Sequence, residues 1–167
     1  MMLFHGGTDR IEHPRILTGD QGRDFAFAFY TTDIRAQSER WALRRARYRS
    51  RLARQAVGAN VCEYELDEAA MSSLSVKRFP EPSLEWLDFV VANRSSLDFR
   101  HGFDVVVGKI ANDRVGETVS YVVAGVMRRE DAVERLRFQQ INSQWAFCTE
   151  KALDLLRFVR SYEVPHV

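Results

Sequence analysis

Short segments in which apolar and polar residues alternate recur along the whole chain of 167 residues, and segments with helical periodicity lie between them. A period of two is typical of a strand with one buried face, whereas apolar residues three and four positions apart are typical of an amphipathic helix. No Pro/Gly/Ser-rich linker and no internal repeat divides the sequence. The pattern therefore predicts one α+β domain that covers residues 1–167.

The periodicity also predicts where the main elements lie. The expected strands cover residues 2–4, 25–31, 60–66, 103–110 and 144–149. The expected helices cover residues 33–55, 84–93, 115–123, 131–138 and 150–160. In the first helix, Trp41, Tyr48 and Leu52 are predicted to form the buried stripe. Ser83 is predicted to cap the second helix.

Charge is distributed unevenly along the chain. The formal net charge of +1 excludes a globally basic nucleic-acid binder. Residues 35–54 nevertheless hold eight arginines and one acid, Glu39, which gives this segment a charge of +7. The segment is interpreted as a solvated helix face. The alternatives are a surface for nucleic acid or an acidic partner, or one that receives the pyrophosphate of NAD.

Several classes of protein are not expected. No apolar stretch approaches the roughly 18 residues that a membrane span needs, and the first residues lack the charged and apolar regions of a signal peptide. The two cysteines, Cys62 and Cys148, and the four histidines have no metal-ligand spacing. The sequence therefore predicts a cytoplasmic protein with no bound metal and no membrane contact.

Polar residues lie at the ends of three expected strands. His5-Gly6 ends the first strand, Tyr30 lies at the end of the second, and Gln144 opens the last. Trp41 follows Tyr30 by eleven residues, on the first expected helix. Each of these residues alone is common in a structural role, but their combination points to a binding site.

This constellation resembles the diphtheria-toxin and poly(ADP-ribose) polymerase branch of the ADP-ribosyltransferase superfamily, the His-Tyr-Glu class. The resemblance implies a split β-sheet with flanking helices, and NAD as the substrate. It implies that His5 binds the ribose next to adenine and that the Gly6 backbone binds the nicotinamide amide. Tyr30 and Trp41 would hold the nicotinamide ring between them, and Gln144 stands where the class has its catalytic glutamate.

The whole chain is also similar to an uncharacterised bacterial domain-of-unknown-function family that is placed in this superfamily. The similarity rests on the blocks LFHGG, DFAFAFYTT, QSERWA, WLDFVVANR, FDVVVGKIAND and QWAFCTEKALDLLRF. The helix expected over residues 150–160 corresponds to an apolar helix that the class places behind its catalytic strand. The resemblance implies a mono-ADP-ribosyltransferase that modifies a protein or a nucleic acid. It further implies the toxin of a toxin–antitoxin pair, with an acidic antitoxin as partner.

Gln144 departs from the pattern of the class. Its amide can hydrogen-bond a ribose hydroxyl but supplies no negative charge as nicotinamide leaves. One preorganised polar group is worth roughly 3–4 kcal/mol of transition-state stabilisation. Two alternatives to transfer therefore stay open, an NAD glycohydrolase and a non-catalytic module that binds NAD or a partner. Glu150, six residues downstream, is the alternative catalytic carboxylate, and its ordinary interpretation is a charge at a helix start.

Overall fold

The computed structural model describes residues 1–18, 24–96, 98–111, 114–137 and 141–165. This part of the chain confirms the expected α+β class in one small domain, with two β-sheets and five α-helices. The strands are β1 (Met2–Gly7), β2 (Phe29–Thr31), β3 (Ala59–Leu66), β4 (Val76–Phe79), β5 (Val105–Ala111), β6 (Ile141–Phe147) and β7 (Leu156–Val164). The helices are α1 (Arg35–Ala53), α2 (Leu84–Ser95), α3 (Arg114–Val123), α4 (Arg129–Arg137) and α5 (Glu150–Leu153), with a 3₁₀ turn, η1 (Ala70–Ser73).

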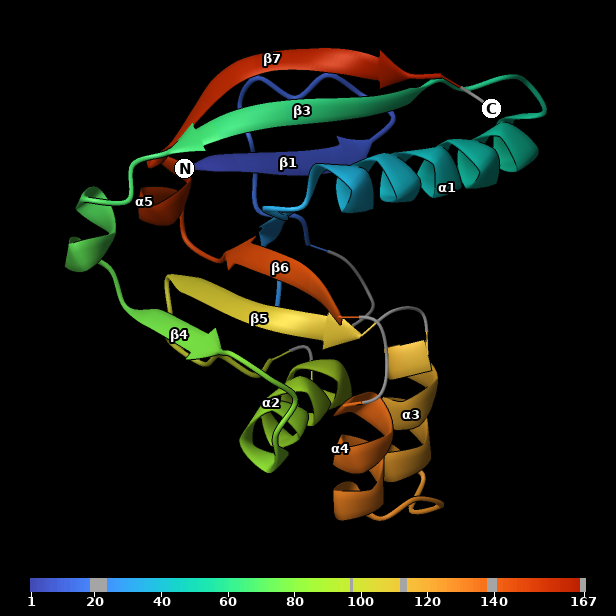
Figure 1. Cartoon of the computed structure of the whole chain (residues 1–167), viewed down its shortest axis with the longest axis vertical. Coiled ribbons are helices and arrows are strands. Elements are labelled where there is room, and N and C mark those ends of the chain that lie inside the picture. The colour runs from blue at the N-terminus through green and yellow to red at the C-terminus, as the bar shows by residue number, and fades with distance from the viewer. Residues whose placement is uncertain (19–23, 97, 112–113, 138–140, 166–167) are drawn as a thin grey trace.

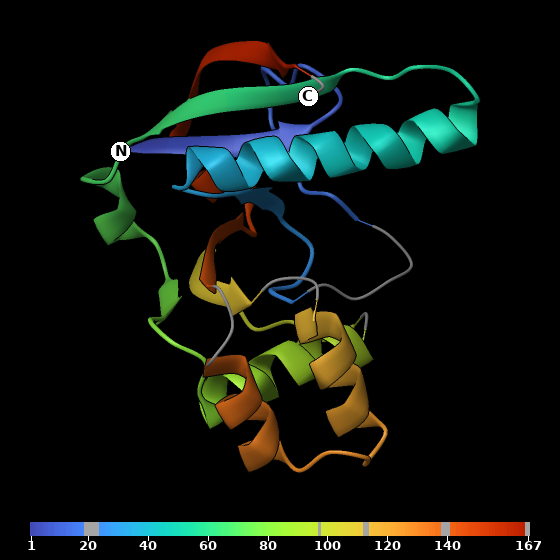
Figure 2. The same cartoon turned by 45° about the vertical axis from the view of Figure 1, so that its right-hand side comes forward.

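The two sheets lie one above the other in Figure 1. The first sheet is antiparallel, with the strand order β1-β3-β7, and α1 runs along one of its faces (Figure 2). The second sheet has the order β2-β6-β5-β4, in which only β4 and β5 are parallel. Helices α2, α3 and α4 gather below the second sheet in both views.

Strand β2 connects the two sheets. It pairs with β6 in the second sheet, and just beyond its end Thr32 makes two backbone hydrogen bonds with Phe4 of β1, of 2.8 and 2.9 Å. Figure 1 shows β2 between the two layers. The expected strand over residues 25–31 is therefore too long. Ala26 has a positive φ of 72°, a conformation that interrupts an extended chain, so the regular strand begins only at Phe29.

Helix α1 packs on the first sheet through its smallest side chains. Its buried residues are Ser38, Ala42 and Ala46. A Cβ atom added to Gly6 of β1 would lie 2.0 Å from the Ser38 carbonyl oxygen, so helix and strand backbones are almost in contact. The prediction that Trp41, Tyr48 and Leu52 form the buried stripe is wrong. These side chains are 46%, 56% and 68% exposed, because a gap this narrow accepts only small residues.

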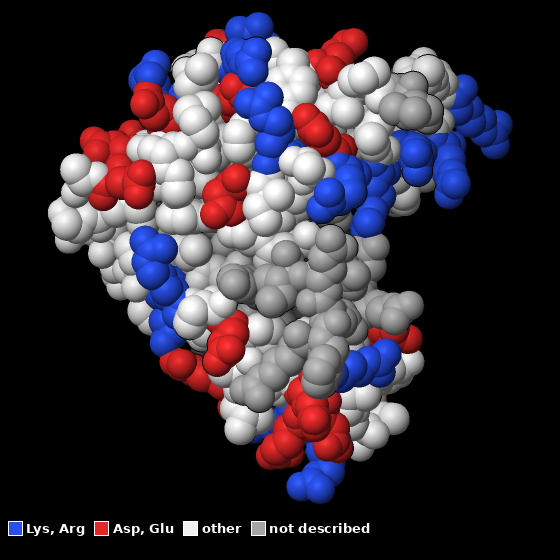
Figure 3. Space-filling model, viewed as in Figure 1, with Lys and Arg blue, Asp and Glu red and all other residues white. Residues whose placement is uncertain are grey.

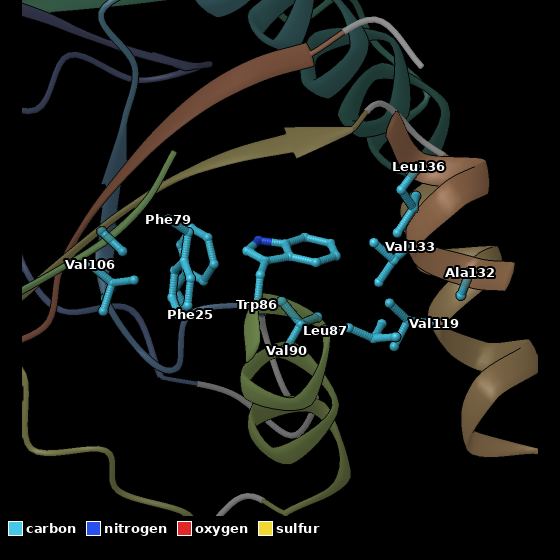
Figure 4. Packing of buried hydrophobic residues seen from close by; sticks show 12 residues of the cluster. Phe25, Phe79, Trp86, Leu87, Val90, Val106, Val119, Ala132, Val133 and Leu136 are labelled. Atoms are coloured by element: carbon cyan, nitrogen blue, oxygen red, sulfur yellow. The ribbon is translucent and has the colours of Figure 1, made fainter. Parts of the chain in front are cut away.

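The core of the second sheet is built from large side chains. Figure 4 shows the Trp86 indole at its centre, between Phe25, Phe79 and Val106 on one side and residues of α3 and α4 on the other. The Ser83 hydroxyl accepts a hydrogen bond from the Trp86 backbone N–H at 3.1 Å, which confirms the predicted cap of α2. Helix α4 begins two residues before the predicted start, and its predicted end at residue 138 lies outside the described residues.

The helix predicted over residues 150–160 is wrong. Helix α5 ends at Leu153, and the chain then forms β7, which pairs with β3 from Leu66↔Leu156 to Ala59↔Val164. Aromatic and β-branched residues such as Phe158 and Val159 favour a strand, and β3 offers an open edge for it. The correspondence between this segment and the apolar helix of the His-Tyr-Glu class is therefore lost.

Candidate functional site

The candidate site lies where β1 and β2 separate. Because Phe4 directs both its N–H and its C=O toward Thr32, the next β1 residue with that orientation is Gly6. Continuing the antiparallel register from Phe4 and Thr32 would place Gly6 opposite Tyr30. Instead the ladder stops. Within the described part of the chain, the Gly6 N–H and C=O have no hydrogen-bond partner. The split thus leaves one backbone donor and one backbone acceptor of the buried Gly6 side by side without a partner in that part of the chain.

His5 fills the start of the split. Its Nδ1 lies 2.7 Å from the Tyr30 carbonyl oxygen, and its ring stacks on Phe29 with a centroid distance of 4.7 Å. A carbonyl oxygen only accepts, so Nδ1 carries the proton, and Nε2 of the neutral ring is an acceptor with no hydrogen-bond partner among the described residues. Burial lowers the pKa of the imidazole, the bond to Tyr30 opposes this, and the charge of Arg45 lowers it further. His5 is therefore held in its neutral form.

Tyr30 and Gln144 share one face of the second sheet. Tyr30 pairs with Ala146, and Gln144 lies two residues before Ala146 on β6. Such diagonal neighbours are about 7–8 Å apart. The Tyr30 hydroxyl donates a hydrogen bond to the Ala26 carbonyl. The Gln144 Oε1 is buried and, among the described residues, receives no hydrogen bond. A buried amide oxygen without a partner carries a desolvation penalty, and a hydrogen bond from a bound ligand would relieve it.

One side of α1 faces the same region. Gln37 makes two hydrogen bonds with the Ser143 backbone of β6, of 2.8 and 3.0 Å. Three turns further, Arg49 contacts Thr8 and Asp9, directly after β1. Residues four apart on a helix lie on one strip, so Trp41 and Arg45 face the space between these two contacts. We call Gln37, Trp41, Arg45 and Arg49 the site strip.

The surface is hollowed beneath α1. Figure 3 shows the arginine side chains of α1 at the upper right and a recess below them, on the side where α3 and α4 lie in Figure 1. Among the described residues, no group of three His, Cys, Asp or Glu side chains could hold a metal ion. In the same part of the chain, no helix is both long and apolar enough to cross a membrane.

Comparison with known proteins gives a family without an assigned activity. A family model described as "Protein of unknown function (DUF3990)" matches residues 1–158. The chain belongs to the DUF3990 family. No curated protein and no solved structure matches it. Membership confirms the expected domain-of-unknown-function family.

The structure brings most of the predicted residues of the DUF3990 chain into one region. His5, Gly6 and Tyr30 meet at the split, and Gln144 shares a sheet face with Tyr30. Trp41 lies on the site strip, with the Arg44 guanidinium 5.6 Å from the centre of its ring. The roles that the resemblance gives to these residues stay predictions.

Glu150 is not part of this region. It is the exposed first residue of α5, which follows the end of β6, whereas Gln144 is the central residue of that strand. The prediction that Gln144 opens the last strand is therefore wrong, because β6 already begins at Ile141. Sequence reasoning missed Gln37 and Arg45. Their spacing of four residues on either side of Trp41 is the signal that could have found them.

Proposed function

We propose that this protein is an NAD-dependent mono-ADP-ribosyltransferase with the split-sheet fold of that superfamily. The observation that carries the proposal is the interrupted ladder between β1 and β2, bordered by His5, Gly6 and Tyr30. These are the residue types, in the chain order, on which the resemblance to the His-Tyr-Glu class rests. In this proposal the protein acts in the cytoplasm as the toxin of a toxin–antitoxin pair, as that resemblance implies.

The split suits the nicotinamide end of NAD. A primary amide offers one acceptor and two donors, which complement the N–H and C=O that Gly6 leaves unpaired at the split among the described residues. Tyr30, on the other border, supplies an aromatic face for the pyridine ring, and the half-exposed Trp41 supplies a second from the site strip. Stacking and the paired hydrogen bonds together fix both the position and the orientation of the leaving group.

His5 and Arg45 suit the remainder of the molecule. The unprotonated Nε2 of His5 can accept a hydrogen bond from a ribose hydroxyl. Arg45 has no acidic partner in the described part of the chain, and its charge acts on His5. A guanidinium is well matched to a pyrophosphate, with which it forms bidentate hydrogen bonds. Arg45 is therefore assigned to the phosphates of NAD.

The proposed reaction breaks one bond and forms one bond at the anomeric carbon of the nicotinamide ribose. The bond to the pyridine nitrogen breaks, and its electron pair leaves with neutral nicotinamide. A nucleophile of the acceptor bonds to the cationic carbon and loses its proton to solvent. The Gln144 amide orients a ribose hydroxyl, and that hydroxyl would satisfy the unpartnered Oε1. Since an amide carries no charge, turnover is expected to be slow.

The test is incubation with NAD labelled in its adenylate half, with and without cell lysate. Released nicotinamide and label on macromolecules are measured separately. We expect Gln144→Ala to lower nicotinamide release on the order of a hundred-fold with little change in NAD affinity, because a bond to the reacting ribose tightens as charge develops. Tyr30→Ala should chiefly weaken NAD binding. Gln144→Glu restores a carboxylate and should raise turnover. Gln55→Ala, an exposed glutamine after α1, is the matched control.

Two other results would replace the proposal, and a third would remove one residue from it. Nicotinamide release without labelling of any macromolecule identifies an NAD glycohydrolase. NAD binding without release identifies a non-catalytic module, for which the amide at position 144 would be sufficient. Turnover that is unchanged in Gln144→Ala shows that Gln144 has no role in the reaction.

A further inference from the structure

A line of arginines follows the outer face of α1. Arg40, Arg44, Arg47, Arg51 and Arg54 are spaced by four and three residues in turn, which places them on one side of the helix. All five are exposed, and the line spans about 21 Å at 1.5 Å per residue. We call these five residues the arginine ridge. Figure 3 shows the basic side chains along α1 on the surface above the recess.

Most of the ridge has no counter-charge among the residues that the structure describes. Arg40, Arg47, Arg51 and Arg54 form no ion pair in the described part of the chain. The α1 arginines that lie toward the sheet differ, because Arg35 pairs with Glu63 at 2.9 Å and Arg49 with Asp9 at 2.6 Å.

The one acid of the helix faces away from the ridge. Glu39 accepts a hydrogen bond from the Tyr162 hydroxyl of β7, so its carboxylate faces the first sheet. The ridge is therefore a row of cations with no acid of α1 among them. Such a row repels itself unless an external anion covers it.

A second exposed row runs beside the ridge. Trp41, Tyr48 and Leu52 lie at intervals of seven and four residues, on the side of α1 that also carries the site strip. Arg44 already covers the Trp41 ring. Exposed aromatic rings next to guanidinium groups are the surface on which proteins stack unpaired bases.

We infer that the arginine ridge binds a single-stranded stretch of nucleic acid, and that this nucleic acid is the acceptor of ADP-ribose. The second half of the inference rests on the proposed function. Phosphates supply an unbroken row of anions that matches five arginines in line, and guanidinium groups bind phosphate bidentately. An acidic protein would complement the charge but would leave Trp41 and Tyr48 without a specific partner. The aromatic row therefore favours nucleic acid.

The positions of the two rows on α1 determine how the bound strand would lie on the protein. With phosphates on the ridge, bases reach across the aromatic row toward the site strip and the split. A nucleophilic nitrogen or hydroxyl of the strand then attacks the anomeric carbon as nicotinamide leaves, and gives its proton to solvent. The ridge thus selects the class of acceptor, and the split performs the reaction.

The experiment measures the affinity of labelled single-stranded RNA and DNA oligonucleotides, and of the matching duplexes, over a series of salt concentrations. The test variant is Arg47→Gln/Arg51→Gln. The control, Arg128→Gln/Arg129→Gln, removes the same charge before and at the start of α4. Each phosphate contact to a single strand contributes about 0.7 to the slope of log affinity against log salt, so the test variant should lower that slope by about 1.4. We expect the test variant to weaken binding on the order of ten-fold at low salt, and the control to leave it unchanged.

Tyr48→Ala tests the aromatic row. It should weaken single-strand binding on the order of ten-fold and affect duplex binding much less, because bases in a duplex are already stacked. Equal binding by wild type and the ridge variant overturns the inference. So does preferential binding of polyglutamate over oligonucleotide, which would identify the ridge as a surface for an acidic protein.

Transfer is then tested with labelled NAD and the oligonucleotide that binds best. We expect label on the oligonucleotide, lost in Arg47→Gln/Arg51→Gln, while nicotinamide release without acceptor stays unchanged in that variant. Label on protein alone overturns the inference and leaves the proposed function intact. Ridge-dependent binding without any nicotinamide release contradicts the proposed function but supports the nucleic-acid surface.

Discussion

The two halves of the molecule are packed in opposite ways. On the first sheet, α1 lies so close that a Cβ atom added to Gly6 would be 2.0 Å from the Ser38 carbonyl oxygen and 3.1 Å from the Ala42 backbone nitrogen. On the second sheet, α2, α3 and α4 are held away from the strands by large side chains such as Trp86 and Phe25 (Figure 4). In the first half, the helix and strand backbones leave no room for larger side chains, so added atoms destabilise it. In the second half, large side chains fill the space between helices and sheet, so their removal leaves a cavity.

This difference bears on where the candidate site lies. The backbone groups of Gly6 belong to the closely packed half, and the Gln144 side chain belongs to the half with the large core. Two backbone hydrogen bonds between Phe4 and Thr32 and the bond from the His5 ring to Tyr30 join the halves at this point. At this border, the first half contributes the backbone groups of Gly6 to the candidate site, and the second half contributes the Gln144 side chain.

The largest effect is expected from removing bulk in the second half. Trp86 is fully buried, so Trp86→Ala should lower the free energy of unfolding by about 3–5 kcal/mol, measured by urea denaturation. Trp86→Phe should cost less, because the indole N–H has no partner among the described residues. Leu84→Ala, at a largely exposed position on the same helix, is the control and should change stability by at most about 0.5 kcal/mol. A Trp86→Ala cost no larger than that of Leu84→Ala would contradict the account of this core.

The next effect comes from adding one methyl group to the first half. Gly6→Ala would place Cβ 2.0 Å from the Ser38 carbonyl oxygen, and both atoms belong to backbones that must then move apart. We expect a loss of about 1–3 kcal/mol in the same denaturation assay.

Gly7→Ala is the matched control for this change. Its nearest contact would be His5 Nε2 at 3.4 Å, at the lower end of ordinary packing. If Gly6→Ala were as stable as Gly7→Ala, the close approach of α1 to β1 would be wrong.

The same contrast explains which parts of the fold could be predicted from the sequence. Ser83 and the valines of β5 were predicted correctly, because a cap and a run of β-branched residues are local signals. The buried face of α1 was not. A hydrophobicity pattern assigns Trp41 to the core and Ala42 to neither face, and only the neighbouring strand reveals that the gap is too narrow for an indole. The prediction for residues 156–160 failed for a related reason. They form part of β7 and not a helix, and the pairing of β7 with β3 is a long-range contact.

The candidate site was predictable in part. His5, Gly6, Tyr30 and Gln144 were singled out because strands and residue order are visible in the sequence. Tyr30 and Gln144 nevertheless lie in the middle of β2 and β6, not at the strand ends where they were predicted. The interruption of the ladder at Gly6 was not visible, because it depends on the Phe4–Thr32 pair. Arg45 is one of eight arginines in its segment, and only its position on the site strip distinguishes it from the others.

The smallest expected effect compares one histidine from each half. Burial lowers the pKa of both His5 and His101, but only His5 also feels a nearby cation, Arg45. A lowered pKa means that the unfolded chain binds more protons, so each histidine makes stability fall as pH drops below about 6.5 toward the folded-state pKa. His5→Asn and His101→Asn should each flatten this part of the curve of unfolding free energy against pH, and the exposed His13→Asn is the control. Added salt screens the charge of Arg45 but does not change burial. The part of the curve removed by His5→Asn should therefore shrink in 0.5 M salt on the order of a few tenths of a kcal/mol, while the part removed by His101→Asn stays constant. An equal response of both to salt would show that Arg45 does not act on His5, and its assignment to the phosphates of NAD would lose its support.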